Sequence, residues 1–202
     1  MDAEKRRRWL INEIVDEKMQ YEAGEEHLYS DLGYLLLGFI VEEKTGKELA
    51  FYWNEVIAKP MGLDNTLFFP GMGQPEKSCF VATCPQNKDR PPGIVDDDNC
   101  RALGGASGHA GLFGTAPGVL KLCQELVDIV HGKKSRLHIS SQTLRRACSR
   151  VGASEWTAGF NMPSRTGSSS GKYFSDKSIG HLGFTGTSFW IDPVKKLAVV
   201  LL

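Results

Sequence analysis

The residues of this chain best suited to chemistry gather near its end, in the stretch 180–193. One histidine, His181, and several hydroxyl side chains alternate there with the glycines Gly180, Gly183 and Gly186. Glycine inside a strand pattern usually marks the close approach of another backbone or of a ligand. The stretch therefore indicates the edge of a binding site, and a bulged hairpin rim is the alternative interpretation.

Two further segments combine titratable side chains with a special backbone context. Tyr29-Ser30-Asp31 stands directly before an apolar helical pattern, and Gly108-His109-Ala110-Gly111-Leu112-Phe113 is rich in glycine. Other patterns are discarded. The run 167–172 ends in Lys but has the wrong spacing for a phosphate-binding loop. The histidines and cysteines show no metal-ligand spacing, so the sequence predicts no metal site.

Composition narrows the class of protein. The chain has 202 residues, of which 41% are hydrophobic and 24% charged, and its net charge is +0. A packed globular core is expected, and a dominant nucleic-acid or membrane-surface role is not, because such a role needs a basic excess. No run is long enough for a transmembrane helix, and the first residues lack a secretory pattern. The compartment stays open. Cys123 and Cys148, with apolar neighbours on predicted helices, are expected to be core thiols.

Helical patterns fill the first three quarters of the chain. The helix over 32–44 is apolar nearly all round, which predicts central burial, and Gly46 ends it. Thr115 is the expected N-cap of a later helix that stops near 131–132. The remaining helices are expected from Asp2 to about Gly24, over 48–59, and from Ser140 or Ser141 through Cys148. Between 68 and 100 the chain is expected to be irregular.

Strand patterns follow, over 156–162, 179–185, 187–191 and 197–202, with a flexible loop at 165–171. Helices first and antiparallel strands last predict an α+β fold, with a helical part over about 1–150 and a sheet part over about 151–202. The last strand is apolar on both faces, so its place is inside a covered sheet, and a chain that stops there is expected to leave at least one sheet face without its cover. Because the chain ends there, we expect one incomplete domain over 1–202.

Taken together, these three segments resemble the serine β-lactamase and penicillin-binding-protein superfamily, in its class C-like branch with esterases and D-amino-acid peptidases. The resemblance begins near Tyr21, runs to Leu202, and is densest over 24–46, 95–116 and 180–202. It implies a partial β-lactamase/transpeptidase-like fold, acyl transfer to or hydrolysis of an ester, an amide, a β-lactam or a D-amino-acid peptide, and no cofactor. A small-molecule or peptide substrate is the implied partner.

By this resemblance, Tyr29 matches the tyrosine that lies beside the family's nucleophilic serine and transfers protons. A tyrosine with a pKa near 10 is a poor base, so neighbouring cations must favour its phenolate or relay its proton. The family's asparagine corresponds to Asp31, which accepts hydrogen bonds but cannot donate one when ionised. Asp31 is therefore suited to bind a cationic group. In the plainer alternative, Ser30 or Asp31 only caps the helix.

The family's Lys-Thr-Gly strand corresponds to His181-Leu182-Gly183. The resemblance implies that His181 supplies a cation or donor and that Phe184 supplies an oxyanion N–H. Gly183 and Thr185 would border the substrate, and His109 would either contact it or simply pack in its loop. A histidine in the lysine position gives a charge that depends on pH near neutrality and weakens the case for β-lactam hydrolysis. Alternatively, His181 donates to a neighbouring loop.

The family's Ser-x-x-Lys nucleophile segment is not found before Tyr29, because residues 1–28 contain no serine. The match at 169–172 lies in a predicted flexible loop and is ascribed to chance. We therefore expect an interior portion of a serine hydrolase that is inactive alone. The alternatives are a non-catalytic binding domain for peptide or cell-wall ligands and a scaffold without a cleft function. Exposed apolar surface at the missing elements is expected to favour self-association.

Overall fold

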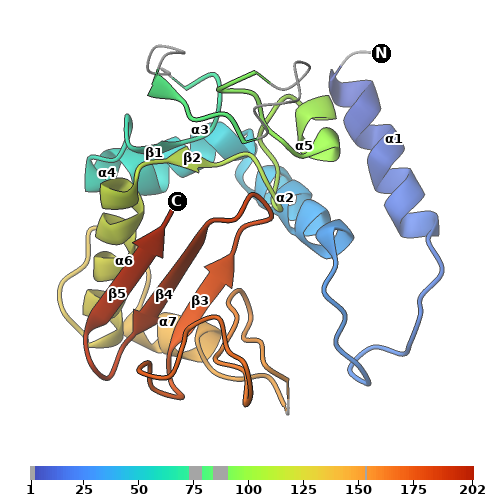
Figure 1. The fold of residues 1–202 in the computed structure, drawn as a ribbon. Coiled ribbons are helices and arrows are strands. Elements are labelled where there is room, and N and C mark those ends of the chain that lie inside the picture. Colours follow the sequence, from blue (N-terminus) through green and yellow to red (C-terminus); the bar gives the residue numbers. More distant parts are fainter. Residues whose placement is uncertain (1–2, 73–78, 84–90, 153) are drawn as a thin grey trace. The chain divides into compact units, whose positions relative to one another are not determined.

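The computed structural model describes residues 3–72, 79–83, 91–152 and 154–202, and Figure 1 shows its helices and strands. The chain forms two compact units. The first consists of Met1–Ala58 and Phe68–Phe113, and the second of Lys59–Leu67 and Gly114–Leu202. One incomplete domain over 1–202 stays a prediction.

The first unit is helical. It contains α1 (Ala3–Asp16), α2 (Asp31–Thr45), α3 (Leu49–Trp53) with the π-helical turn η1 (Asn54–Ala58), and α5 (Asp98–Ala102). Arg7 of α1 ties that helix to α2, because its guanidinium pairs with Glu42 at 2.8 Å and lies 5.0 Å from the ring centre of Phe39. Gly46, at φ 65°, ends α2 by donating its N–H to the Glu42 carbonyl, as its sequence predicted.

Helix α2 is less buried than its apolar sequence predicted. Only Leu35 and Gly38 are buried, whereas Leu37 and Ile40 are 53% and 54% exposed. The prediction of central burial is wrong for this structure, because α2 packs against α3 and the 108 loop along one face only. The prediction that the first helix reaches Gly24 is also wrong. After Asp16 the chain has no apolar face to pack, and Met19 is 71% exposed. The expected cap Asp2 lies outside the described residues.

Short elements that the sequence did not reveal lie at the two ends of the segment expected to be irregular, 68–100, and just beyond it. Strand β1 (Leu67–Phe68) pairs with β2 (Phe113–Gly114) in a two-stranded sheet. The side chain of Asp97 accepts a hydrogen bond from the Cys100 N–H at 2.7 Å and so caps α5. Elements of two to five residues are too short to display a hydrophobic period, which is why the pattern did not predict them.

The second unit packs helices on an antiparallel sheet. Helix α6 (Ala116–Val130) packs against α7 (Ser141–Ala147) and against two strands of the sheet. The sheet has the order β3-β4-β5, formed by β3 (Ile179–Leu182), β4 (Ser188–Asp192) and β5 (Leu197–Leu201), and the short helix α4 (Lys59–Met61) also belongs to this unit. Thr115 and Ser140 cap α6 and α7 as predicted. Together with the first unit, this order of helices and then antiparallel strands confirms the α+β class.

One face of this sheet holds the core of the second unit. Cys123 and Val127 of α6 form a buried cluster with Ile179 and Ile191, and Cys148 packs against it. Both cysteines are thus core thiols, as predicted, and burial raises the pKa of each to about 11.

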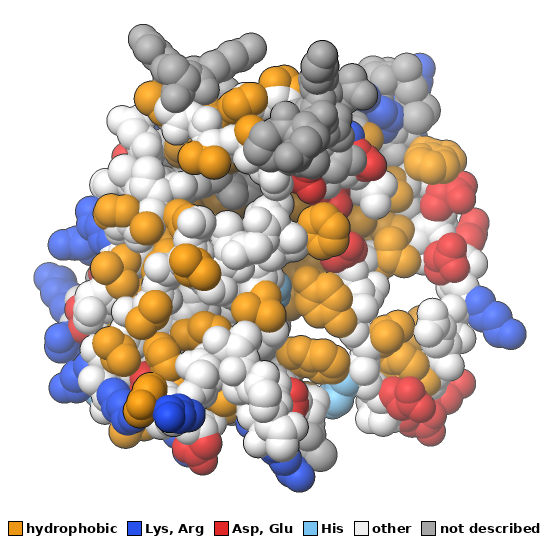
Figure 2. Space-filling model, in the orientation of Figure 1, with side chains coloured by type: hydrophobic (Ala, Val, Ile, Leu, Met, Phe, Trp, Pro, Cys, Tyr) orange, Lys and Arg blue, Asp and Glu red, His pale blue; other side chains and the backbone are white. Residues whose placement is uncertain are grey.

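The opposite face of the sheet is open in the described structure. Leu197, Val199 and Leu201 of β5 alternate with the core residues and are 42%, 50% and 62% exposed. Figure 2 shows hydrophobic side chains gathered over this part of the surface. Among the described residues, one face of the sheet is therefore uncovered, as expected for an incomplete domain whose last strand is apolar on both faces.

The segment 156–162 is a tight turn and not the predicted strand. The Thr157 side chain accepts hydrogen bonds from the N–H groups of Gly159 and Phe160, which reverses the chain after one isolated bridge at Trp156. Only Asn161 then reaches β3, by bridging Gly180. Thr157 and Gly159 favour a turn. The aromatic and apolar residues around them give the segment a strand-like sequence pattern, which is why the sequence predicts a strand.

Asp192 closes the sheet at the end of β4 and is 0% exposed. Its carboxylate accepts hydrogen bonds from the Ser175 N–H and hydroxyl and from the N–H groups of Val194 and Lys195. Burial opposes ionisation, but the hydrogen bonds from Lys195, Ser175 and Val194 outweigh it and lower the pKa of Asp192. The ionised carboxylate is therefore the form that the fold requires.

We predict that Asp192→Asn lowers the free energy of unfolding at pH 7 by about 2–3 kcal/mol. Both carboxylate oxygens of Asp192 accept hydrogen bonds, and the amide NH2 group that replaces one of them cannot accept any. The folded pKa lies below the unfolded one, so this stabilisation is present above about pH 4 and is lost as the pH falls through the folded pKa. Urea unfolding from pH 7 to pH 3 should show a shallower pH dependence for the variant. The exposed Asp176→Asn serves as the control, and equal pH profiles of Asp192→Asn and wild type would contradict the prediction.

Candidate functional site

The first candidate segment stands at the amino end of α2. Ser30 occupies the N-cap position in an extended conformation, but its side chain makes no capping hydrogen bond to the helix. Asp31 is the first helical residue and is exposed, and Tyr29 is 56% exposed just before it. The hydroxyl-capping alternative is therefore not what the Ser30 side chain does here, and Asp31 adds a favourable negative charge to the first turn.

The surroundings of Tyr29 favour its neutral phenol. Partial burial raises the pKa of Tyr29, and the negative charge of Asp31 and the neighbouring Tyr34 raise it further. At neutral pH this tyrosine is thus suited to donate a proton or relay one, whereas acting as a base requires a cation brought close to it.

The glycine-rich loop lies directly on α2. A Cβ atom on Gly108 would stand 1.9 Å from the carbonyl oxygen of Tyr34, and one on Gly38 would stand 3.0 Å from the Gly108 nitrogen. Only a residue without a side chain fits at 108, because backbone meets backbone there. This contact fixes the loop against the helix whose first turn carries Tyr29 and Asp31.

His109 is enclosed in its own loop. Its side chain is 3% exposed, and its Nδ1 and Nε2 lie 2.8 Å from Ser107 Oγ and from Asp97 Oδ1. Burial opposes ionisation of Asp97, but the hydrogen bonds from the Cys100 N–H and from His109 outweigh it and lower the pKa of that carboxyl. These contacts describe loop packing, and contact between His109 and a substrate stays a prediction. Sequence reasoning missed Asp97 and Ser107, although an aspartate at a helix start is a recognisable cap signal.

The second candidate segment is the turn between β3 and β4. His181 lies opposite Phe189 and is partly buried, with its Nδ1 2.8 Å from the Leu182 carbonyl oxygen. The Gly183 N–H donates to the Thr187 carbonyl at 2.7 Å, and Gly186 has φ 90°, which closes a tight turn. Phe184 is 99% exposed at its tip. The turn therefore presents Phe184 and Thr185 outward on a hydrogen-bonded frame.

The glycines of this hairpin are explained by β4. A Cβ atom on Gly180 would meet the Phe189 carbonyl oxygen at 2.3 Å and the Trp190 ring at 2.6 Å. One on Gly183 would meet Thr187 Oγ1 at 2.1 Å. The backbone of β4 thus requires glycine at 180, and the Thr187 side chain, just before β4, crowds a Cβ atom at 183; both observations agree with the hairpin-rim interpretation. The substrate-side role of the turn stays a prediction.

The sequence-predicted residues are divided between the two units. Tyr29, Asp31 and His109 belong to the first unit, and a second set belongs to the other. That second set consists of His181, Gly183, Phe184 and Thr185. Among the described residues, no group of three or more His, Cys, Asp or Glu side chains is placed to hold a metal ion. No helix in the described part of the chain has the length and apolar character needed to cross a membrane.

Comparison with known proteins gives a consistent result. A family model described as Beta-lactamase matches residues 2–202. A candidate D-alanyl-D-alanine carboxypeptidase of Escherichia coli O157:H7 is 32% identical over 205 residues, covering 91% of this chain and 46% of that protein. An N-acetylmuramyl-L-alanine amidase of Bacillus subtilis (strain 168) is 32% identical over 204 residues, covering 91% and 45%.

The fold has solved counterparts. The crystal structure of a penicillin-binding-protein homologue from Caulobacter crescentus superposes with a TM-score of 0.67 at 16% identity, covering 98% of this chain and 58% of that one. This likeness confirms the partial β-lactamase/transpeptidase-like fold. The chain spans about half the length of the curated relatives it matches.

We predict that Asp31→Asn lowers the pKa of Tyr29, because it removes a negative charge that disfavours the phenolate. A pH titration of the Tyr29 ring carbon by NMR measures this directly. Glu43→Gln is the matched control, since it removes a carboxylate from the same helix twelve residues away, about 18 Å along its axis. An unchanged or higher Tyr29 pKa in Asp31→Asn would show that the two side chains do not interact.

We also predict that Gly108→Ala destabilises the first unit by about 3 kcal/mol or more, because a methyl group cannot coexist with the Tyr34 carbonyl. Gly33→Ala in α2 is the control: nothing lies within 4 Å of its Cβ position, so the helix gains up to about 1 kcal/mol. Chemical unfolding followed by circular dichroism compares the two. Similar midpoints would rule out the close contact.

Proposed function

The chain belongs to the beta-lactamase family, and on that premise we propose that it supplies the tyrosine and oxyanion-strand segments of a serine hydrolase acting by acyl transfer. The observation that carries the proposal is the family match over residues 2–202, which includes all three candidate segments. Two of its curated relatives are named for a carboxypeptidase and an amidase. An amide of a D-amino-acid or cell-wall peptide is therefore the substrate that we favour over an ester or a β-lactam.

In this proposal Tyr29 delivers a proton. Its phenol is protonated at neutral pH, and partial burial and Asp31 raise its pKa further, so it acts as a relay: the proton that it gives to the leaving amine is replaced by the one that the attacking serine hydroxyl loses. The exposed carboxylate of Asp31 accepts hydrogen bonds only, which suits a substrate ammonium group or a lysine of the nucleophile segment better than a carbonyl oxygen.

The turn after β3 stabilises the transition state. The N–H of Phe184 is proposed as one oxyanion donor, held by the hydrogen-bonded turn between Gly183 and Gly186. A donor of this kind contributes about 3 kcal/mol, because it faces charge that develops only in the tetrahedral intermediate. His181 supplies a donor or a cation for a substrate carboxylate, and the edge formed by Gly183 and Thr185 borders the substrate backbone.

The nucleophile is proposed to lie outside the 202 residues. No Ser-x-x-Lys stands before Tyr29, and the formal match at 169–172 is a loop in which Ser170 is buried and hydrogen-bonded to Ser168. The described part of that loop has no helix, whereas the family's serine stands at a helix start.

We predict that a fluorophosphonate or penicillin probe leaves the 202-residue chain unlabelled, as measured by intact-protein mass spectrometry. A full-length relative with its own Ser-x-x-Lys is the positive control. Stoichiometric labelling of any serine in this chain would overturn the proposed division of the machinery. Calorimetry with an acyl-D-alanyl-D-alanine peptide adds a second readout: tight binding of the peptide by the unlabelled chain would favour a non-catalytic binding domain over a hydrolase portion.

A further inference from the structure

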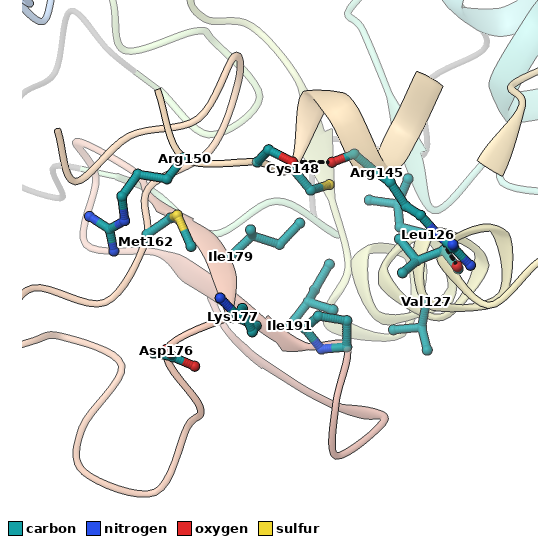
Figure 3. Close-up of a pocket in the computed structure, with 13 residues that line it drawn as sticks. Leu126, Val127, Arg145, Cys148, Arg150, Met162, Asp176, Lys177, Ile179 and Ile191 are labelled. Carbon is teal, nitrogen blue, oxygen red and sulfur yellow. Dashed lines mark hydrogen bonds between the residues drawn. The ribbon is translucent and has the colours of Figure 1, made fainter. Parts of the chain in front are cut away.

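The second unit contains an apolar cavity of about 400 Å³ to which no role has been assigned above (Figure 3). Its walls come from α6, the end of α7, β3 and β4. Six apolar side chains that line it are Leu126, Val127, Val130, Met162, Ile179 and Ile191. Small-molecule sites in proteins typically measure about 300–1,000 Å³ and are mostly apolar. The cavity therefore has the size and lining of a ligand site.

Cations dominate the rim of the cavity. Arg145, Arg150 and Lys177 line it together with one carboxylate, Asp176, and all four are exposed. Backbone carbonyls hold two of these side chains, because Arg145 Nε donates to Val130 at 2.8 Å and Arg150 Nη1 donates to Ser154 at 2.5 Å. A guanidinium has five N–H donors, so each arginine keeps others for a ligand.

A second hollow of about 500 Å³ shares Arg150 and Asp176 with the cavity and adds Arg165. Apolar walls thus lie beside a rim with an excess of positive charge. A ligand complementary to both has an apolar chain and a negatively charged end. A cationic amphiphile would meet repulsion at the rim, and a fully polar anion would leave the apolar walls unfilled.

We propose that this cavity binds a small amphiphilic anion, with its hydrocarbon chain among the α6, β3 and β4 side chains and its carboxylate at Lys177 and Arg150. Burial of the hydrocarbon chain against these apolar walls is the main source of affinity. The charged end remains at the solvent, where the exposed cations give selectivity with modest energy.

Cys148 is a further apolar residue in the wall of the cavity. It packs against the core cluster and lines the cavity, and burial raises the pKa of its thiol to about 11. At neutral pH it is a neutral thiol and a weak nucleophile, so the cavity is suited to reversible binding. The site uses none of the residues assigned to acyl transfer, and it does not depend on that function.

The test is titration of the 202-residue chain with octanoate, decanoate and dodecanoate below their critical micelle concentrations, followed by NMR amide shifts and calorimetry. The expected result is saturable binding with shifts at Leu126, Val130 and Ile179, and an affinity that rises at least tenfold from octanoate to dodecanoate, because each buried methylene adds affinity. Decyltrimethylammonium, with the same chain length as decanoate and the opposite charge, should bind at least threefold more weakly than decanoate.

Variants separate the head-group contacts from the cavity. Lys177→Gln and Arg150→Gln should each weaken decanoate binding about threefold, whereas the exposed Lys134→Gln, a matched charge loss away from the cavity, should not. Val130→Phe should fill the cavity and reduce binding most. If that variant fails to fold, the surface variants Lys177→Gln and Arg150→Gln still test whether the cationic rim binds the carboxylate.

Three outcomes would overturn the proposal. One is the absence of saturable binding of any carboxylate in the series. Another is equal affinity for decanoate and decyltrimethylammonium, which would remove the role of the cationic rim. The third is attachment to vesicles of anionic phospholipid without binding of monomeric carboxylates, which would assign the rim to a membrane surface.

Discussion

Close approach of backbone to backbone, at distances that only glycine permits, is the constraint on which the glycine-rich loop at 108 and the β3–β4 hairpin depend. Gly108 rests on the Tyr34 carbonyl of α2, and Gly180 lies under Trp190 and against the Phe189 carbonyl. Gly118 of α6 meets the carbonyl of Thr66 in the same way. Each contact leaves no room for a side chain on the glycine. It also fixes the position of a loop or strand that carries a polar group. These glycines therefore hold in place the segments that carry the polar side chains.

Carboxylates serve two opposite purposes in this fold. Asp97 and Asp192 are held ionised by converging hydrogen-bond donors, and each organises a turn or a short helix. Asp31 stands exposed beside Tyr29, where its negative charge raises the pKa of that tyrosine. The distinction lies in the number of donors: a buried carboxylate must be satisfied, whereas an exposed one remains available to a partner.

Apolar surface remains open on both units. Leu37 and Ile40 on α2 and Val199 and Leu201 on β5 are each about half exposed or more. The matched relatives are about twice as long as this chain, which agrees with such faces being covered by other parts of the family fold. Self-association through these faces stays a prediction. The acyl-transfer proposal and the cavity proposal concern different residues, so either can fail alone.

The sequence by itself determined the family, the α+β order, and the caps at Gly46, Thr115 and Ser140, because those signals are local and periodic. It also singled out Tyr29, Asp31 and His181 by motif. Tertiary structure alone decided that α2 is half exposed and that 156–162 turns back on itself. It also decided that His109 is enclosed by Ser107 and Asp97 and that an apolar cavity lies beside α6. Burial and hydrogen-bond partners depend on which distant segments meet, and no local pattern in the sequence encodes that meeting.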